Sequence, residues 1–252
     1  MSKNDNPDEI LHRFLDLANQ ADRKGIVLFS NFLNMYEINL LHQNESLFYN
    51  RFSLYGGYQE AERQMVAFQP DALYYNWEYP ISCVQVEPLN HRFYEDLSHR
   101  DILGALMHLG IDRSLIGDIL IKDKSAYIFC VEKMADFIIK ELYKIKHTQV
   151  MTQFIKPVDL HIEMQYRTEE GFIASNRLDA FVAQACKLSR AQAAQFILGE
   201  NVFINGALVT NHNQGLAEGD ILSLRGYGKL RFEAFLNTTK KGRLHIRYAW
   251  YV

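Results

Sequence analysis

The stretch from residue 176 to residue 226 most constrains the fold, because it predicts two short helices followed by a small sheet. The first helix is predicted by apolar residues at helical spacing, Leu178, Phe181, Val182 and Ala185. The second begins at Ser189, because Gln192 stands three positions further on and completes a capping box. Gly199 ends this second helix. Its packing stripe is predicted from small and apolar residues, Ala191, Ala194 and Leu198.

Short strands are predicted after these helices. Segment 202–204 is apolar, and Asn205-Gly206 is typical of the tight turn of a hairpin that returns through 207–209. Another turn at 218–220 precedes a last apolar segment, Ile221, Leu222 and Leu224. The stretch therefore predicts two helices packed on a small antiparallel sheet.

This arrangement resembles the S4 RNA-binding domain, whose pattern includes Arg-Leu-Asp at 177–179, Ser-Arg-x-x-Ala at 189–193 and Val-x-Ile-Asn-Gly at 202–206. The resemblance implies that the two helices present basic and polar side chains to structured RNA. The matching positions on or beside that surface are Arg177, Lys187, Ser189, Arg190 and Gln192. Asn205 and Arg225 stand in matching motifs as well, although Asn205 also suits a purely structural role in its turn. In another interpretation, Arg177 and Asp179 simply cap and pair at the start of the helix.

The distribution of charge agrees with a localised polyanion-binding surface. The chain has 252 residues, a hydrophobic content of 48% and a net charge of −3, which allows two or three globular domains. From residue 176 onward, ten Lys and Arg face five Asp and Glu, giving +5, whereas the remainder carries −8. A basic end on an acidic body favours RNA as the partner. A solvated charged face would give the same count.

The residues after the S4 motif predict an ordered basic extension, within a C-terminal domain of residues 171–252. Residues 225–252 hold seven basic side chains and one acid, and their aromatic and aliphatic residues alternate at strand period. We expect two strands that extend the sheet, joined by a turn at 239–242 that carries Lys240 and Lys241. The basic residues expected beside the helical RNA surface are Lys229, Arg231, Arg243 and Arg247. A flexible basic tail is the alternative.

Residues 1–79 are predicted to form a mainly helical N-terminal region. One helix is expected over 7–23, a second from Ser30 or Asn31 to His42, and a helical turn over 60–66. Many aromatic residues surround the Gly56-Gly57 break. They suit either base stacking or a packed core, and we favour the core.

Residues 80–170 predict a ferredoxin-like βαββαβ domain as a candidate RNA-binding domain. We expect strands at 81–86, 118–121, 127–131 and 158–166, with a turn at 122–124. Helices are expected from Ser98, capped by Asp101 and ending at Gly110, and over 132–145. RNA-recognition motifs share this plan. The segment 124–131 lacks the glycines of their signature, but Tyr127 and Phe129 alternate onto one face, so an RNA role and a packing role both remain open.

Together these segments resemble the YlmH family of bacterial S4-domain proteins, through GGYQEAER at 56–63, HRDILGALMHLGIDRSLIGDIL at 99–120 and the S4 motif. The resemblance implies an α+β, non-enzymatic RNA-binding protein. It also implies association with ribosomal RNA, especially of the large subunit, including stalled complexes with tRNA. Quality control of stalled ribosomes and cell division are the processes that it suggests.

Other kinds of site are not indicated. His99-Arg100-Asp101 is similar to a kinase catalytic loop, but Leu106 stands where Asn is needed, so a helix cap is favoured. We find no nucleotide-binding loop and no metal-ligand spacing, so no cofactor, metal or small-molecule substrate is expected. An RNA-modifying enzyme with an S4 targeting domain is the main alternative, and a module that binds an acidic protein is another.

The sequence also predicts a cytoplasmic protein. Its three cysteines, Cys83, Cys130 and Cys186, are far apart and suggest no disulfide framework. The N-terminus lacks the apolar segment of a signal peptide. A run of apolar residues long enough to span a membrane is also lacking, so no membrane partner is expected.

Overall fold

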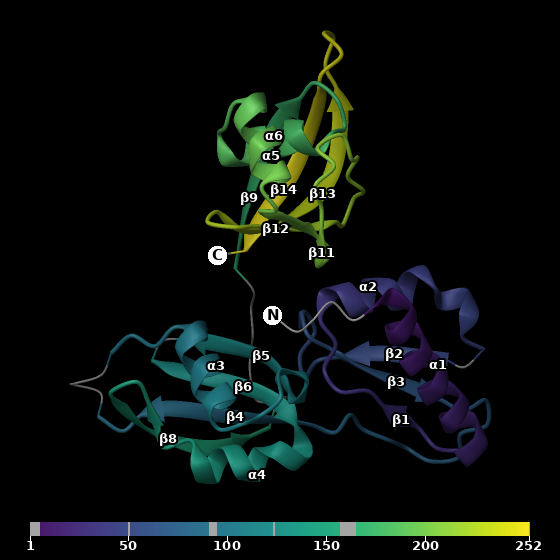
Figure 1. Ribbon diagram of the computed structural model, residues 1–252, viewed down its shortest axis with the longest axis vertical. Helices are drawn as coiled ribbons and strands as arrows, with labels where there is room; N and C mark the ends of the chain where they lie inside the picture. Colours follow the sequence, from purple (N-terminus) through teal and green to yellow (C-terminus); the bar gives the residue numbers. More distant parts are fainter. Residues whose placement is uncertain (1–5, 50, 91–94, 123, 157–164, 252) are drawn as a thin grey trace. The chain divides into compact units, whose positions relative to one another are not determined.

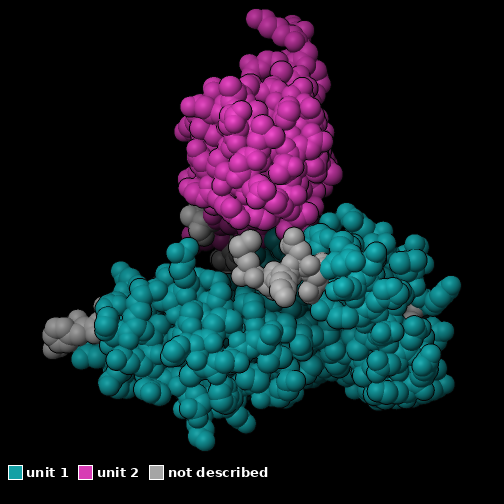
Figure 2. All heavy atoms as spheres, viewed as in Figure 1, with its two compact units in different colours: residues 1–162 teal, residues 163–252 magenta. Residues whose placement is uncertain are grey.

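The computed structural model describes residues 6–49, 51–90, 95–122, 124–156 and 165–251 (Figure 1). The chain divides into two units, unit 1 of residues 1–162 and unit 2 of residues 163–252 (Figure 2). Helices and sheets occur in both units, which confirms the α+β class. Unit 1 contains the N-terminal region and the middle region up to residue 162. Unit 2 contains the S4 motif with its extension, and it begins at residue 163, eight residues before the expected boundary at 171.

The N-terminal part of unit 1 combines two helices with a three-stranded sheet that the sequence analysis missed. Its elements are α1 (Pro7–Lys24), β1 (Leu28–Phe29), α2 (Met35–Gln43), the 3₁₀ helix η1 (Glu45–Leu47), β2 (Arg51–Tyr55) and β3 (Met65–Gln69). The strand order is β1-β3-β2. The aromatic residues Phe48, Phe52 and Phe68 pack edge to face or tilted within this core. The core interpretation is therefore confirmed for these three rings. It is wrong for Tyr49 and Tyr74, which are 95% and 94% exposed.

Two expectations in this region are wrong. The second helix begins at Met35 and not at Ser30 or Asn31, because the side chain of Asn34 forms a capping box with Glu37. No helical turn occupies 60–66, since this segment is a loop up to residue 64 and then enters β3. Periodicity alone could not reveal a loop whose contacts are made with distant residues.

The middle part of unit 1 has the ferredoxin-like strand order. Its elements are β4 (Ile81–Pro88), α3 (His99–His108), the 3₁₀ helix η2 (Arg113–Leu115), β5 (Ile116–Lys122), β6 (Ser125–Val131), α4 (Glu132–Glu141), β7 (Lys144–Ile145) and β8 (Thr148–Ile155). The sheet order is β5-β6-β4-β8-β7, with antiparallel neighbours. The predicted plan is confirmed, as is the capping box between Ser98 and Asp101.

The end of this domain differs from the prediction. Helix α4 ends at Glu141 because Leu142 leaves the helix and the strand β7 pairs with β8. The closing strand is β8, which pairs with β4, whereas a strand over 158–166 was expected. Residues 157–164 lie outside the described residues, and Tyr166 begins a strand of unit 2. Asp123, in the expected turn at 122–124, also lies outside them.

Unit 2 places two helices on one face of a six-stranded sheet (Figure 1). The helices are α5 (Leu178–Cys186) and α6 (Arg190–Leu198), and the strands are β9 (Tyr166–Ile173), β10 (Val202–Ile204), β11 (Ala207–Leu208), β12 (Ile221–Leu224), β13 (Gly228–Thr238) and β14 (Leu244–Tyr251). The strand order is β11-β10-β12-β13-β14-β9. The predicted apolar face of α5 is buried, which confirms that part of the S4 pattern. The predicted ordered extension is also confirmed, because β13 and β14 pair and enlarge the sheet.

Helix α6 packs through a different stripe from the predicted one. Its buried residues are Ala193 and Ile197, whereas Ala191 is exposed and the Leu198 side chain is 52% exposed. The Ser189–Gln192 capping box is present as predicted. In a helix of only nine residues, several stripes satisfy the same spacing, and the neighbouring helix selects one of them.

Candidate nucleic-acid interface

Two arginines on the helices of unit 2 share one buried carboxylate. Arg177 precedes α5, Arg190 begins α6, and Asp179 lies in the first turn of α5 with only 4% of its surface exposed. The Arg177 Nε and Nη2 atoms donate to the two Asp179 carboxylate oxygens at 3.1 and 2.8 Å. The Arg190 Nη2 atom donates to both oxygens at 2.8 Å. A single carboxylate thus fixes two guanidinium groups that are far apart in the sequence.

The backbone around this carboxylate is itself held in place. The Leu178 and Asp179 amides donate to the carbonyls of Gln214 and His212 at 2.8 and 3.1 Å. The Asn176 side chain also bonds both backbone groups of Leu216. The loop after β11 therefore fixes the start of α5, and with it the position of the carboxylate.

The charge state of Asp179 suits this arrangement. Burial acts to raise the pKa of Asp179, but the hydrogen bonds and charges of Arg177 and Arg190 outweigh burial, and the pKa lies below its ordinary value. The arginine side chains remain 39% and 46% exposed. Because the planar fork of a guanidinium matches phosphate oxygens, the pair can hold a phosphate while Asp179 fixes its direction. The expected pairing of Arg177 with Asp179 is observed, and it leaves both guanidinium groups accessible to solvent.

Three other predicted residues stand beside this pair. Lys187 ends α5 in a left-handed conformation, with φ of 56°, and its side chain is exposed between the two helices. The Ser189 hydroxyl accepts from the Gln192 amide at 3.2 Å, and the Gln192 side chain accepts from the Ser189 amide at 2.9 Å. These two residues therefore act as the helix cap. We call Arg177, Lys187 and Arg190 the helix face.

Asn205 serves the turn between β10 and β11. Its backbone has φ of 48°, its side-chain nitrogen donates to Asp220 at 2.8 Å, and its side-chain oxygen accepts from the Ile221 amide at 2.9 Å. These contacts tie the hairpin to β12. The structure therefore gives Asn205 a local structural role, the alternative raised by its sequence.

The basic residues of β13 and β14 lie on the opposite side of the sheet from the helices. The alternate residues Leu230, Phe232, Ile246 and Tyr248 are buried in the core that contains α5 and α6. Lys229, Arg231 and Arg247 stand between them in sequence, and the pleat directs successive side chains to opposite faces. The expectation that they lie beside the helical surface is therefore wrong.

This opposite surface combines cations with aromatic rings. Arg225 lies over the Phe203 ring at 5.2 Å, Lys229 over Tyr251 at 5.3 Å, and Arg231 over Tyr166 and Tyr251 at 5.7 and 5.9 Å. Arg247 is held by Glu170, with an Nε–Oε1 distance of 3.1 Å. We call this surface the sheet face, formed by Tyr166, Phe203, Arg225, Lys229, Arg231, Arg247 and Tyr251.

The turn between β13 and β14 carries the remaining predicted cations. Lys240 and Lys241 are exposed, and the turn is closed by the Gly242 amide, which donates to the Thr239 carbonyl at 2.8 Å. This end of the hairpin projects from unit 2 (Figures 1 and 2). Arg243 differs from the two lysines, because its Nη2 atom donates to the Phe172 carbonyl at 2.8 Å and its guanidinium lies 5.8 Å from the Phe172 ring. Arg243 therefore anchors the hairpin to β9.

The middle domain keeps only one of its two candidate stacking rings accessible. Phe129 is fully buried beneath Tyr58, with ring centroids 5.2 Å apart, whereas Tyr127 is half-buried. Gly57 allows this contact, because a Cβ atom there would meet the Phe129 ring at 2.3 Å. The chain itself therefore occupies the position where Phe129 could stack a base.

A buried carboxylate fixes the segment that covers Phe129. Asp118 accepts from the Tyr58 hydroxyl and the Glu62 amide at 2.7 Å, and from the Arg63 amide at 3.1 Å. Burial raises the pKa of Asp118, while its hydrogen bonds act to lower it. The motif at 56–63 is thus the joint between the two parts of unit 1.

Comparisons with known proteins identify both parts of this architecture. One family model, described as "Putative RNA-binding domain in YlmH", matches residues 76–158, and the S4 domain model matches residues 176–222. A Bacillus subtilis (strain 168) protein named "Ribosome-associated protein quality control protein P2" is 28% identical over 197 residues, covering 77% of this chain and 75% of the relative. The chain belongs to the YlmH family. The solved "Cell division protein ylmH from Streptococcus pneumoniae" shares the fold, with a TM-score of 0.52 and 22% identity over 65% of this chain and 99% of that chain.

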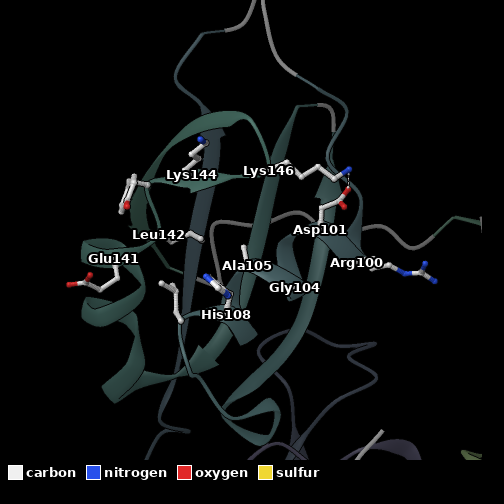
Figure 3. A pocket seen from close by; sticks show the side chains of 11 residues that line it. Arg100, Asp101, Gly104, Ala105, His108, Glu141, Leu142, Lys144 and Lys146 are labelled. Atoms are coloured by element: carbon white, nitrogen blue, oxygen red, sulfur yellow. Dashed lines mark ion pairs between the residues drawn. The ribbon is translucent and has the colours of Figure 1, made fainter.

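A pocket with charged walls lies in the middle domain of this YlmH-family chain, between α3 and the β7 region (Figure 3). Its volume is about 500 Å³, and its charged lining residues are the cations Arg100, Lys144 and Lys146 and the carboxylates Asp101 and Glu141. Lys146 pairs with Asp101 at 2.8 Å. That hydrogen bond, with those from Ser98, lowers the pKa of Asp101 to about 2. The carboxylate thus serves the helix cap and a lysine, which confirms the cap interpretation of His99-Arg100-Asp101.

The residue that sequence reasoning underrated is Asp179. It was considered only as a partner of Arg177, although it also orients Arg190 across two helices. Its place in the Arg-Leu-Asp pattern of the S4 domain was the available signal.

Among the described residues, we find no cluster of three or more His, Cys, Asp or Glu suited to a metal ion. The helices that the structure describes include none long and apolar enough to cross a membrane.

Proposed function

We propose that this chain is a non-enzymatic protein that binds ribosomal RNA of the large subunit and acts in quality control of stalled complexes that carry tRNA. The name of the Bacillus subtilis relative supports the ribosome as its site of action. The name of the Streptococcus pneumoniae protein supports a link to cell division. The two RNA-binding family models support RNA as the ligand. We further propose that the protein works in the cytoplasm.

The observation that carries this proposal is the pair of arginines on Asp179. Arg177 and Arg190 stay oriented before RNA arrives, so binding costs less side-chain entropy than it would for two free arginines. Lys187, exposed at the end of α5, is a third cation that we expect to contact the same RNA. A charged surface of this kind contacts phosphates, which fixes orientation on a structured RNA without reading its sequence.

The test is binding of the full-length protein to purified large ribosomal subunits. The double substitution Arg177→Ala/Arg190→Ala should lower the affinity by at least about tenfold, because charge-assisted contacts are stronger than neutral ones. The matched control is Arg167→Ala, which removes an arginine of unit 2 that pairs only at the surface with Glu169. Wild-type affinity of the double variant would overturn the assignment of the helix face.

A second measurement addresses the state of the ribosome and the competing functions. Subunits that carry a peptidyl-tRNA should bind more tightly than empty subunits if stalled complexes are the target. Association that survives complete nuclease treatment would instead favour an acidic protein partner. New modified nucleosides in ribosomal RNA incubated with the protein would favour the enzyme alternative.

A further inference from the structure

The sheet face is built differently from the helix face. On the helix face, cations are held by a carboxylate. On the sheet face, three cations lie over aromatic rings at 5.2 to 5.9 Å, in the pairs Arg225 with Phe203, Lys229 with Tyr251, and Arg231 with Tyr166 and Tyr251. The Tyr166 and Tyr251 rings also meet edge to face, with centroids 5.1 Å apart. Rings and cations therefore alternate across one surface.

These two faces are separated by the core of unit 2. Helices α5 and α6 pack on buried residues of the sheet, including Leu222, Leu230 and Phe232. The pleat places Lys229 and Arg231 on the other side of the same strand. An RNA helix that rests on Arg177 and Arg190 therefore cannot also rest on the sheet face, because a layer of helices and a sheet stand between them.

The chemistry of the sheet face fits RNA with unpaired bases. Every base offers a π-face that stacks on an aromatic ring or a guanidinium plane, and the cations beside the rings balance the phosphates. Glu170 on β9 lies 3.1 Å from Arg247, whose guanidinium compensates the charge of this carboxylate. Binding of an acidic protein would require cations on this surface but no aromatic rings between them. The sheet face has both, which favours RNA as the partner.

We propose that the sheet face binds a single-stranded RNA segment while the helix face holds a structured RNA, so that one YlmH-family chain bridges two RNA segments. This proposal rests on the proposed function for the helix face and adds a second, separate contact. The two contacts differ in chemistry, because stacking dominates on the sheet face and phosphate contact dominates on the helix face.

The test measures two RNA probes on the full-length protein. One probe is a fluorescent oligouridylate of about 12 nucleotides, within the range of known single-strand site sizes. The other is an RNA hairpin with a fully paired stem and a short loop. Saturation with the hairpin should change the affinity for oligouridylate less than about twofold, and a complex with both RNAs should form. Competition between the two probes for one site would overturn the proposal.

Substitutions separate the two faces. Arg225→Ala combined with Arg231→Ala should weaken oligouridylate binding by about tenfold, since each contact with a base contributes substantially. Hairpin binding by this variant should stay unchanged. Arg177→Ala/Arg190→Ala should have the opposite effect. Circular dichroism and thermal unfolding show whether each variant is folded, and Arg225→Ala alone provides a milder change at an exposed residue if the double variant unfolds.

The outcomes distinguish this proposal from the proposed function. In one outcome, both variants bind the hairpin as the wild type does, and only the sheet-face variant loses oligouridylate binding. That result would overturn the helix-face assignment and keep the single-strand site. Oligouridylate binding that equals the wild type in both sheet-face variants would overturn the single-strand site alone. Capture of an acidic polypeptide such as polyglutamate with equal affinity would also overturn it, since that result needs charge but no stacking.

Discussion

Arg190 joins the two helices of unit 2 through Asp179. In the proposed function it also contacts RNA. We expect Arg190→Ala to weaken RNA binding by about tenfold, the loss of one charge-assisted phosphate contact. The protein should stay folded, because Arg177 still neutralises Asp179 with two hydrogen bonds. Filter binding and thermal unfolding measure the two effects, with Arg167→Ala as the control. A large fall in melting temperature with unchanged affinity of the folded protein would make Arg190 purely structural.

Asp179 gives the stability of unit 2 a defined dependence on pH. Its pKa in the folded protein lies below the ordinary value of about 3.9. A depressed pKa contributes stability that is present above the unfolded pKa and is lost as the pH falls through the folded pKa. We therefore expect Asp179→Asn to be less stable than the wild type at neutral pH. The difference should narrow below about pH 4.

Thermal unfolding of both proteins between about pH 2 and about pH 7, a range that extends below the ordinary pKa of an aspartate, measures this difference. Asp179→Asn should also bind RNA less tightly at neutral pH, because the two guanidinium groups would repel each other without the carboxylate. A stability difference that is constant across the range would contradict the assigned ionisation.

In unit 1, Asp118 is the buried carboxylate that accepts hydrogen bonds from a distant segment. Asp118→Ala should lower the free energy of unfolding by about 2–4 kcal/mol, because it leaves buried donors of Tyr58, Glu62 and Arg63 without their acceptor. Tyr58→Phe removes one of the three bonds and should cost about 1 kcal/mol. Chemical denaturation measures both. A loss for Asp118→Ala no larger than that for Tyr58→Phe would show that the backbone contacts contribute little.

At the scale of elements, the hairpin of β13 and β14 should contribute phosphate contacts at its end. Replacing Lys240 and Lys241 by alanine should reduce the slope of log affinity against log salt by about 1.5–2, since each phosphate contact contributes slightly less than one. Affinity should fall by a similar factor for different RNAs, because such contacts do not read sequence. A salt titration measures the slope. An unchanged slope would remove the end of the hairpin from the binding surface.

Arg243 is kept unchanged in that variant, so that only the charge at the end of the hairpin is altered. Because it anchors the hairpin to Phe172, replacing it together with the lysines would mix loss of charge with loss of structure. The variant with two substitutions keeps this anchor. Arg243→Ala, measured separately by thermal unfolding, should be the less stable protein of the two.

The elements also show what the sequence could predict. Local signals were sufficient for α5, for the Ser98 and Ser189 caps and for the strands of the basic extension, since each depends on residues close in sequence. The strand β8 was missed. The placement of Lys229 and Arg231 on the opposite face was also missed, because their side was set by how the sheet packs on α5 and α6. Likewise, Phe129 fitted a stacking platform until the distant Tyr58 covered it.

At the scale of the whole molecule, charge is divided between the two units. Unit 2 has eleven Lys and Arg against eight Asp and Glu, a net +3, and unit 1 has sixteen against twenty-two, a net −6. The long-range field of unit 1 therefore opposes RNA, while unit 2 attracts it. Two features of unit 1 favour a contact, the half-buried Tyr127 and the cations Arg100 and Lys144 in the lining of the pocket.

We therefore expect residues 163–252 alone to retain most of the affinity for RNA, and residues 1–162 alone to bind poorly. The physical reason is that unit 2 combines a favourable charge with both faces, whereas Phe129, the second candidate stacking ring of unit 1, is buried. Filter binding of both fragments and the full chain to one RNA, at one salt concentration, measures the division. Circular dichroism must show that each fragment is folded. Equal affinity of the two folded fragments would place a main binding site in unit 1, and the pocket at Arg100 and Lys144 would be the first place to seek it.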